Sequence, residues 1–284
     1  MAKRVSRPAA LAKPDRARLG FGPVSVAEAY EAYLVPQLFE PWAADLVARA
    51  GLFPGAVVLD VATGTGVVAR QAAAAVGPLG KVFACDLSAG MLAFAASKPS
   101  LPGSAPIEYL EWSATALAAS EASFDAVLCQ QGLQFFSERE AALREMHRVA
   151  RQGGRVIVST WAAERPLGLF GPMVDAMVDS GMDEPFPRAF DSSSYGLGAR
   201  RLEELFLKAG FAGVSVETAQ MDALWETTED AVETLNGTPF APLVAALDEQ
   251  WRQRLRTLYL ERLAPSPAGT VTVATVINLA RGIK

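Results

Sequence analysis

Between residues 56 and 161 the sequence alternates short apolar runs with segments of helical spacing. Strands that alternate with helices at this interval build βαβ units, and a parallel sheet needs helices on both of its faces. The pattern therefore predicts an α/β fold with a buried parallel sheet. The runs predicted as strands are Ala56–Val61, Lys81–Asp86, Ile107–Glu111, Phe124–Cys129 and Arg155–Trp161.

Helix boundaries are also predicted around this alternation. Residues 24–50 have helical spacing and end at Gly51, and helices are expected over Gly64–Val76 and Ser88–Ser97. The run Ser137-Glu138-Arg139-Glu140 has the form of a capping box, which predicts a helix that runs to about Arg151.

The alternation of apolar runs and helical segments ends after Trp161. Residues 162–198 carry four prolines and are expected to form a lid or substrate-binding insertion. A helix over 199–209, a strand over 212–224, helices over 227–263 and a last strand over 270–280 follow. The predicted organisation is a disordered basic tail (1–20), cap helices with a cofactor-binding core (21–161), the lid (162–198), and completion of the sheet with a helical cap at about 225–264 (199–284).

Composition excludes several classes of function. A net charge of −5 argues against a general nucleic-acid binder, which needs a basic surface. Two cysteines, Cys85 and Cys129, and a single histidine cannot build an ordinary zinc or iron–sulfur site, so no metal is expected. No apolar stretch reaches the roughly 18 residues of a membrane span. A reducing cytoplasm is the expected compartment.

The strongest local signal is the strand Val57–Val61 running into the glycine-rich turn at Gly64 and Gly66. Glycine lets the backbone approach a ligand closely, and Asp86, about 20 residues on, is placed to bind ribose hydroxyls. This much also fits a dinucleotide site. Asp60, however, stands at the strand end before the glycines, where a dinucleotide fold has no need of an acid.

Taken together, the motifs resemble the class I S-adenosylmethionine-dependent methyltransferases of the quinone-biosynthesis C-methyltransferase type. The resemblance rests on residues 59–66, on Asp86-Leu87-Ser88-x-x-Met91-Leu92, on 123–127, on Glu145–Val149 with 153–156, and on 202–211. It implies a Rossmann-like, seven-stranded, mostly parallel sheet with helices on both faces, an antiparallel last strand and a helical lid.

The resemblance also implies S-adenosylmethionine as cofactor and assigns residues to it. The turn would pass under its methionine part, Asp86 would bind its ribose, and Leu87 with Met91 would sandwich its adenine. Ser113 stands where the family usually has Asp or Asn. The full set of implied cofactor-binding residues is Tyr30, Asp60, Ala62, Thr63, Gly64, Gly66, Asp86, Leu87, Met91, Ser113, Ala114 and Gln130.

The methyl acceptor is expected under the lid. Met and aromatic side chains suit an apolar or aromatic small molecule, and the predicted acceptor-binding residues are Gln134, Trp161, Phe170, Met173 and Phe190. No side-chain constellation indicates a dedicated base, so methyl transfer to an O, N or C atom is expected to depend on positioning and desolvation. Gln131 and Tyr195 are the weak candidates for a polar assist, and His147 is placed mid-helix, away from the site.

Other functions stay open on sequence alone. The glycine turn is compatible with an NAD(P)-dependent oxidoreductase, and the fold with a non-catalytic cofactor- or partner-binding module. A cyclisation assisted by the bound sulfonium, without methyl transfer, is a further alternative. The partner expected is a small molecule from secondary metabolism rather than nucleic acid or membrane, and a homodimer is left open.

Overall fold

The structure is a computed structural model, which describes residues 24–163, 168–180, 196–238, 241–263 and 265–284. Through the first half of the chain the elements are α1 (Val24–Tyr33), one turn of π-helix η2 (Val35–Phe39), α2 (Glu40–Ala50), β1 (Val57–Val61), α3 (Val67–Val76), β2 (Lys81–Asp86), α4 (Ala89–Ser97), β3 (Ile107–Glu111), β4 (Phe124–Gln130), the 3-10 turn η3 (Leu133–Phe135) and α5 (Arg139–Val149).

The second half of the chain completes the sheet and adds helices at one end of it. Its elements are β5 (Ala150–Trp161), α6 (Phe170–Ser180), α8 (Ala199–Lys208), β6 (Ala212–Trp225), α9 (Thr228–Glu233), the 3-10 turn η5 (Thr234–Gly237), α10 (Ala241–Ala245), α11 (Glu249–Arg262) and β7 (Val271–Ile283).

The seven strands form one sheet in the order β3-β2-β1-β4-β5-β7-β6. β7 is antiparallel to both of its neighbours, and the pairs from β3 to β5 are parallel. This confirms the predicted Rossmann-like sheet with an antiparallel last strand. The strand order reverses between β1 and β4, and ligands of open α/β sheets bind at such a point, beyond the carboxyl ends of the strands.

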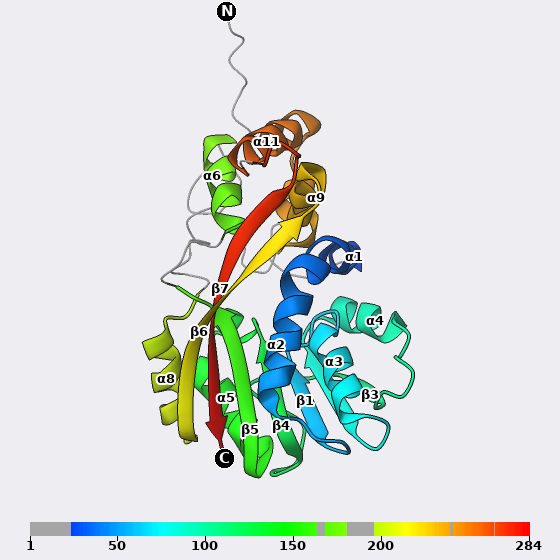
Figure 1. Ribbon diagram of the computed structural model, residues 1–284, viewed down its shortest axis with the longest axis vertical. Helices are drawn as coiled ribbons and strands as arrows, with labels where there is room; N and C mark the ends of the chain where they lie inside the picture. The colour runs from blue at the N-terminus through cyan, green and yellow to red at the C-terminus, as the bar shows by residue number, and fades with distance from the viewer. Residues whose placement is uncertain (1–23, 164–167, 181–195, 239–240, 264) are drawn as a thin grey trace, which may run out of the picture.

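Both faces of the sheet are covered, as its continuous apolar strands require. α2 and α3 cover one face, where Trp42 and Leu46 pack with Leu128 and Ile157. α5 and α8 cover the other, where their side chains pack with Val127 and Val158 of the same strands (Figure 1). Side chains on β4 and β5 therefore alternate between the two faces up to the last residue of each strand.

One local prediction was wrong, and another is confirmed only in outline. The capping box at Ser137 does not form: α5 begins at Arg139 with Glu138 as its N-cap, and no side chain makes a capping bond there. Glu138 has φ −116° and ψ 66°, and it follows the extended residue Phe136 at the end of η3. The helical stretch expected over 227–263 is divided into α9, η5, α10 and α11.

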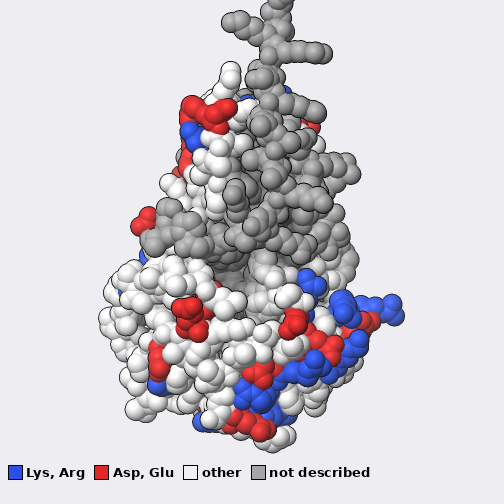
Figure 2. Space-filling view, turned by 180° about the vertical axis from the view of Figure 1, so that it is seen from behind, with Lys and Arg blue, Asp and Glu red and all other residues white. Residues whose placement is uncertain are grey.

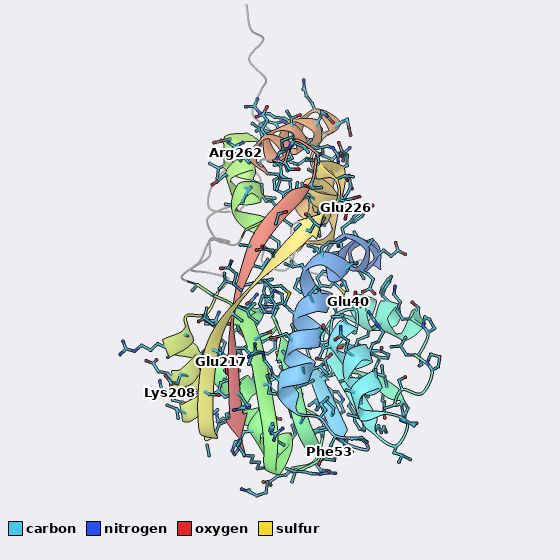
Figure 3. All side chains as sticks on the ribbon, in the orientation of Figure 1. Glu40, Phe53, Lys208, Glu217, Glu226 and Arg262 are labelled. Carbon is cyan, nitrogen blue, oxygen red and sulfur yellow. The ribbon has the colours of Figure 1, made fainter. Side chains whose placement is uncertain are left out.

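β6 and β7 extend beyond the other strands as a two-stranded ribbon. β5 ends at Trp161, opposite Ile277, whereas β6 and β7 stay paired as far as Trp225 and Val271. The ribbon carries α6, α9 and α11 at its far end (Figure 1). Figure 3 labels Glu226 where the ribbon meets these helices and Arg262 on α11, which pairs with Asp179 of α6.

Helix α1 lies between this group of helices and the sheet. The indole Nε1 of Trp225 donates to the carbonyl of Tyr33 at 3.1 Å, and η5 packs along α1. Gly237 of η5 touches the α1 backbone so closely that a Cβ there would lie 2.7 Å from both N and Cα of Tyr30. The backbone position of Tyr30 is therefore set from outside the sheet.

Replacement of Gly237 by alanine is expected to shift α1 relative to η5. The added methyl would overlap Tyr30 backbone atoms, and overpacking of this kind costs about 1–3 kcal/mol of folding free energy. Thermal denaturation should show the loss. Gly171→Ala, in α6, is the matched control: its Cβ would meet nothing within 4 Å, so alanine should be neutral or stabilising by about 0.5–1 kcal/mol. Equal effects at both positions would contradict the tight contact.

None of the helices in the described ranges has the length and hydropathy that a transmembrane span requires.

Candidate functional site

The glycine-rich turn after β1 opens a cradle at the carboxyl edge of the sheet. Three of its residues have left-handed backbone angles: Ala62 (φ 58°), Gly64 (φ 56°) and Gly66 (φ 83°). The amide of Thr63 donates to the carbonyl of Cys85 at 3.0 Å, which ties the turn to β2. A non-glycine residue in this conformation stores strain, and such strain collects at ligand sites.

Asp86 ends β2 and faces this turn. One carboxylate oxygen accepts from the amide of Gly64 and the other from the amide of Ser88, both at 2.9 Å. Burial raises the pKa of Asp86, and the amide donors partly offset this. Each carboxylate oxygen keeps a further lone pair for a ligand, so Asp86 can hold two vicinal hydroxyls without releasing the turn.

Asp60 lies beneath the turn and is 1% exposed. Its carboxylate accepts a 2.5 Å hydrogen bond from the hydroxyl of Thr63. Burial raises the pKa of Asp60 to about 7, against the lowering effect of the Thr63 hydroxyl, and the nearby charge of Asp86 raises it further. The floor of the cradle therefore carries two carboxyl groups with little solvent between them.

Tyr30 reaches the cradle from α1. Burial raises the pKa of Tyr30 well above its usual value, and the negative charges of Glu31, Asp86 and Asp60 add to this effect. The next residue, Glu31, pairs with Arg70 at 2.9 Å, and Arg70 donates to the carbonyl of Thr65 at 2.5 Å. Helix α1 is thus tied directly to the glycine turn.

Gly64 gives a test of the cradle. Its Cβ would meet nothing within 4 Å, so a methyl there would point into the space left open for a ligand. Gly64→Ala should cost about 1–2 kcal/mol of stability, from the left-handed backbone alone, and should weaken nucleoside binding at least about tenfold, a loss of about 1.4 kcal/mol. Isothermal titration calorimetry and thermal denaturation measure the two effects.

Gly103 provides the matched control for that prediction. It also has a left-handed backbone (φ 75°), and a Cβ added there would meet nothing within 4 Å, but it lies in the loop before β3. Gly103→Ala should lose similar stability and keep full ligand affinity. If both variants bind equally well, the space at Gly64 is not a ligand site.

A second group of polar side chains lies where β4 and β5 end. Gln130 donates from Nε2 to the carbonyl of Phe39 at 2.8 Å, and Gln134 accepts on Oε1 from the amide of Trp161 at 2.9 Å. Gln131 has a left-handed backbone (φ 53°). Each of the three glutamines is at least nine-tenths buried, and one or two atoms of its side-chain amide have no hydrogen-bond partner.

A row of aromatic rings joins the two parts of the site. Tyr30 stacks on Phe39 with ring centroids 4.8 Å apart, and Phe39 lies 6.2 Å from Trp161. Beyond Trp161, a small recess of about 10 Å³ is lined by this ring, Leu38, Leu169, Phe170 and the ribbon residues Thr275 and Val276. An apolar wall therefore runs from the cradle to the base of the ribbon.

The remaining predicted site residues are less centrally placed. Leu87 is 70% exposed at the rim, whereas Met91 is buried in the first turn of α4. Ser113 shares a 2.9 Å hydroxyl contact with Thr115, next to the buried Ala114. Met173 is buried in α6. Phe190 and Tyr195 lie outside the described residues.

His147 lies where the sequence placed it, away from the cradle. Its ring, on α5, packs edge-on against Phe211 with centroids 5.0 Å apart. Burial lowers the pKa of His147. Neither observation brings this histidine to the carboxyl edge of β1 or β2.

Sequence reasoning missed several contributors. Glu31 and Arg70 fix α1 to the core through their ion pair, and nothing in their spacing indicates this. Ser159 and Thr160 are buried with unpartnered hydroxyls at the end of β5. The sequence does mark Ser159 and Thr160 as unusual, because they follow the apolar run Val156–Val158 and separate it from Trp161.

The charge pattern does not outline a polyanion site on the face shown in Figure 2. Acidic and basic side chains are interleaved there, and the described residues of this face carry no broad basic patch. Among the described residues, no three His, Cys, Asp or Glu side chains lie together as metal ligands.

Comparison with known proteins places this geometry in context. The family described as "Methyltransferase domain" matches residues 59–158. Demethylmenaquinone methyltransferase of Lactococcus lactis is 31% identical over 186 residues, which cover 62% of this chain and 73% of that protein. The ubiquinone/menaquinone biosynthesis C-methyltransferase UbiE of Hahella chejuensis is 38% identical over 118 residues, 41% of this chain. That match spans 47% of the Hahella protein, about half of its length.

Solved structures share the fold at low identity. Phosphoethanolamine N-methyltransferase 2 of Haemonchus contortus, in complex with S-adenosyl-L-methionine, superposes with a TM-score of 0.61 at 19% identity, over 92% of this chain and 57% of that one. The [4+2]-cyclase SpnF superposes with a TM-score of 0.53 at 19% identity, over 86% and 81% of the two chains. Since one fold carries both a methyltransferase and a cyclase, the reaction has to be argued from the site.

Proposed function

The chain belongs to the class I S-adenosylmethionine-dependent methyltransferases, and from this premise we propose that it methylates a small, uncharged, largely apolar molecule held between the cradle and the ribbon. S-adenosylmethionine is the cofactor of this family. We propose the class of the acceptor, the place of its reacting atom, and the residues that bind the cofactor and the acceptor.

The acidity of the cradle carries the proposal. Asp60 and Asp86 lie under and beside the glycine turn, and both have pKa values raised by burial. A ligand with a sulfonium and an ammonium group would relieve this crowding of carboxylates, whereas the pyrophosphate of a dinucleotide would add to it. This charge balance favours a methyltransferase over a nicotinamide-dependent oxidoreductase.

The other cradle residues fit the cofactor in chemistry. Oε1 of Gln130 has no partner, and because its Nε2 already donates to Phe39, the free atom is an acceptor suited to an ammonium group. Asp86 would accept from the ribose hydroxyls. The open space over Gly64 leaves room for the methionine part, and the ring of Tyr30 would close the site from α1.

We assign the adenine to the rim formed by Leu87, Met91, Ser113 and Ala114. Leu87 offers an exposed apolar surface there. The hydroxyl of Ser113 is engaged by Thr115, so adenine recognition at this point would fall to backbone groups.

In the proposed reaction the cofactor, when bound, supplies the electrophilic methyl group and the leaving thioether. The protein residues orient the acceptor and exclude water. Trp161 and Phe170, which line the recess at the end of the aromatic row, would hold an apolar body there, backed by the buried Met173, and would bring its reacting atom in line with the methyl. His147 lies away from the site, and Asp60 is shielded beneath the turn, so positioning and desolvation are the main effects proposed.

Ligand binding and turnover test this proposal separately. Calorimetry should give micromolar affinity for S-adenosylhomocysteine and none for NAD. Incubation with methyl-labelled S-adenosylmethionine and candidate acceptors, followed by mass spectrometry, should give products that have gained one methyl group. Products that form without a gain in mass would instead support the cyclase alternative, and tight NAD binding would overturn the cofactor assignment.

A further inference from the structure

Unpartnered polar atoms gather at one place in this molecule. Among the described residues, ten buried side-chain atoms lack a hydrogen-bond partner, and four of them belong to Gln131, Gln134 and Ser159, at the ends of β4 and β5. Folded proteins leave few such atoms unpaired, because each has lost its water without gaining a partner. A cluster of them is therefore a sign of a ligand that completes the bonding.

The ends of β4 and β5 place these three residues next to one another along the backbone. Gln130 and Ser159 are Cα partners on β4 and β5, and the amide of Gln131 donates to the carbonyl of Ser159 at 2.9 Å. Alternation along β5 puts Ser159 on the face of Ile157 and Trp161, the face that carries Phe39. Thr160 points to the opposite face, with Val158, and is not part of this group.

The hydrogen bonds that these side chains already make determine whether each remaining free atom can donate or accept. Gln134 receives the Trp161 amide on its carbonyl oxygen, so its free nitrogen is a donor. Gln131 offers both a free donor and a free acceptor, and the Ser159 hydroxyl serves as either. None of these groups carries a charge, which distinguishes them from the carboxylates of the cradle.

We infer that Gln131, Gln134 and Ser159 form a subsite, here called the amide subsite, that selects an uncharged methyl acceptor bearing a carbonyl oxygen next to a hydroxyl or N–H group. This rests on the proposed function and narrows its substrate class. An anionic or cationic acceptor group would enter without a counter-charge from these three side chains, at a large desolvation cost. An acceptor without polar groups would leave them unpaired.

The aromatic row supplies the rest of the fit. Trp161 carries the amide that orients Gln134, and its ring lies 6.2 Å from Phe39. A flat ring placed against Trp161 would therefore present its edge substituents to the amide subsite. The same residue orders the polar group and forms the apolar wall.

Gln131→Met is the sharpest variant, since the side chain of Gln131 makes no hydrogen bond within the described protein. Loss of the Gln131 side-chain amide should leave the melting temperature unchanged or raise it, whereas removal of a structural glutamine would lower the melting temperature. Binding is measured by calorimetry on the complex with S-adenosylhomocysteine. The probes are salicylamide, which is neutral with both hydrogen-bonding groups, salicylate, which is anionic, phenethylamine, which is cationic, and ethylbenzene, which is apolar.

The wild-type complex should bind salicylamide at least about tenfold more tightly than the other three probes, and Gln131→Met and Ser159→Ala should each remove most of that preference. Thr160→Val, on the opposite face of the same strand, should leave it intact. Preference for a charged or apolar probe, no binding of any probe, or an equal effect of Thr160→Val would overturn the amide subsite. Failure of the wild type to bind S-adenosylhomocysteine would instead overturn the proposed function.

Discussion

Asp86→Ala should weaken the affinity for S-adenosylhomocysteine by about 100-fold or more. A hydrogen bond to a charged group contributes about 1.5–3 kcal/mol, and loss of two such bonds to ribose hydroxyls accounts for at least about 2.8 kcal/mol of binding free energy. Asp86 also holds the amides of Gly64 and Ser88 at 2.9 Å, so the turn itself loses an anchor. Calorimetry measures the affinity, and the melting temperature reports the effect on the turn.

Asp125→Ala separates a cofactor role from the general loss of a carboxylate. Asp125 accepts from the amide of Val57 at 2.7 Å and pairs with Arg151 at 2.6 Å, where β4 begins, at the far edge of the sheet from the cradle. This variant should lose stability and keep its affinity for S-adenosylhomocysteine. If the two variants lose affinity equally, Asp86 acts through folding alone and the ribose assignment is wrong.

The sheet was predictable because its signal is local. Buried parallel strands require continuous apolar runs, and residues such as Val57–Val61 and Phe124–Gln130 stand out between glycine turns and helical segments. The cradle followed for the same reason, since Asp60, Gly64 and Asp86 are placed by strand ends that the pattern defines. Here the order of elements along the chain determines which side chains meet.

The rest of the site depends on contacts between distant segments. Tyr30 is positioned through Gly237 of η5, about 200 residues away, and no spacing rule links the two. The broken helices over 227–263 follow from packing on α1 and α6, which overrides helical periodicity. Ser159 and Thr160 were overlooked because polar residues near the end of a strand usually meet solvent, whereas here both residues are buried, one on each face of the sheet.

Asp60→Asn is expected to stabilise the protein without ligand at neutral and alkaline pH. The carboxyl group of Asp60 has a pKa of about 7 in the folded chain, against 3.8 for its usual value, so folding favours the protonated form. Stability is therefore present in full below pH 3.8 and is lost as pH rises to about 7, by about 4 kcal/mol in all. Asparagine keeps the acceptor for the Thr63 hydroxyl and carries no charge, so the variant should escape this loss. Chemical denaturation of both proteins at pH about 4, 6 and 8 measures the difference.

Glu145→Gln tests whether that pH dependence has the expected sign. The hydrogen bonds from Arg148 hold the pKa of Glu145 below its usual value, so its contribution is present above that value and disappears as the solution is acidified. The gain in unfolding free energy from Asp60→Asn should grow as pH rises, whereas the loss of unfolding free energy from Glu145→Gln should shrink as pH falls. Bound S-adenosylmethionine should then reduce the difference in unfolding free energy between wild type and Asp60→Asn, because a cationic ligand compensates the buried carboxylate only in the wild type. A difference that is constant with pH would mean that folding leaves the pKa of Asp60 at its ordinary value, and the acidic cradle would no longer favour a sulfonium.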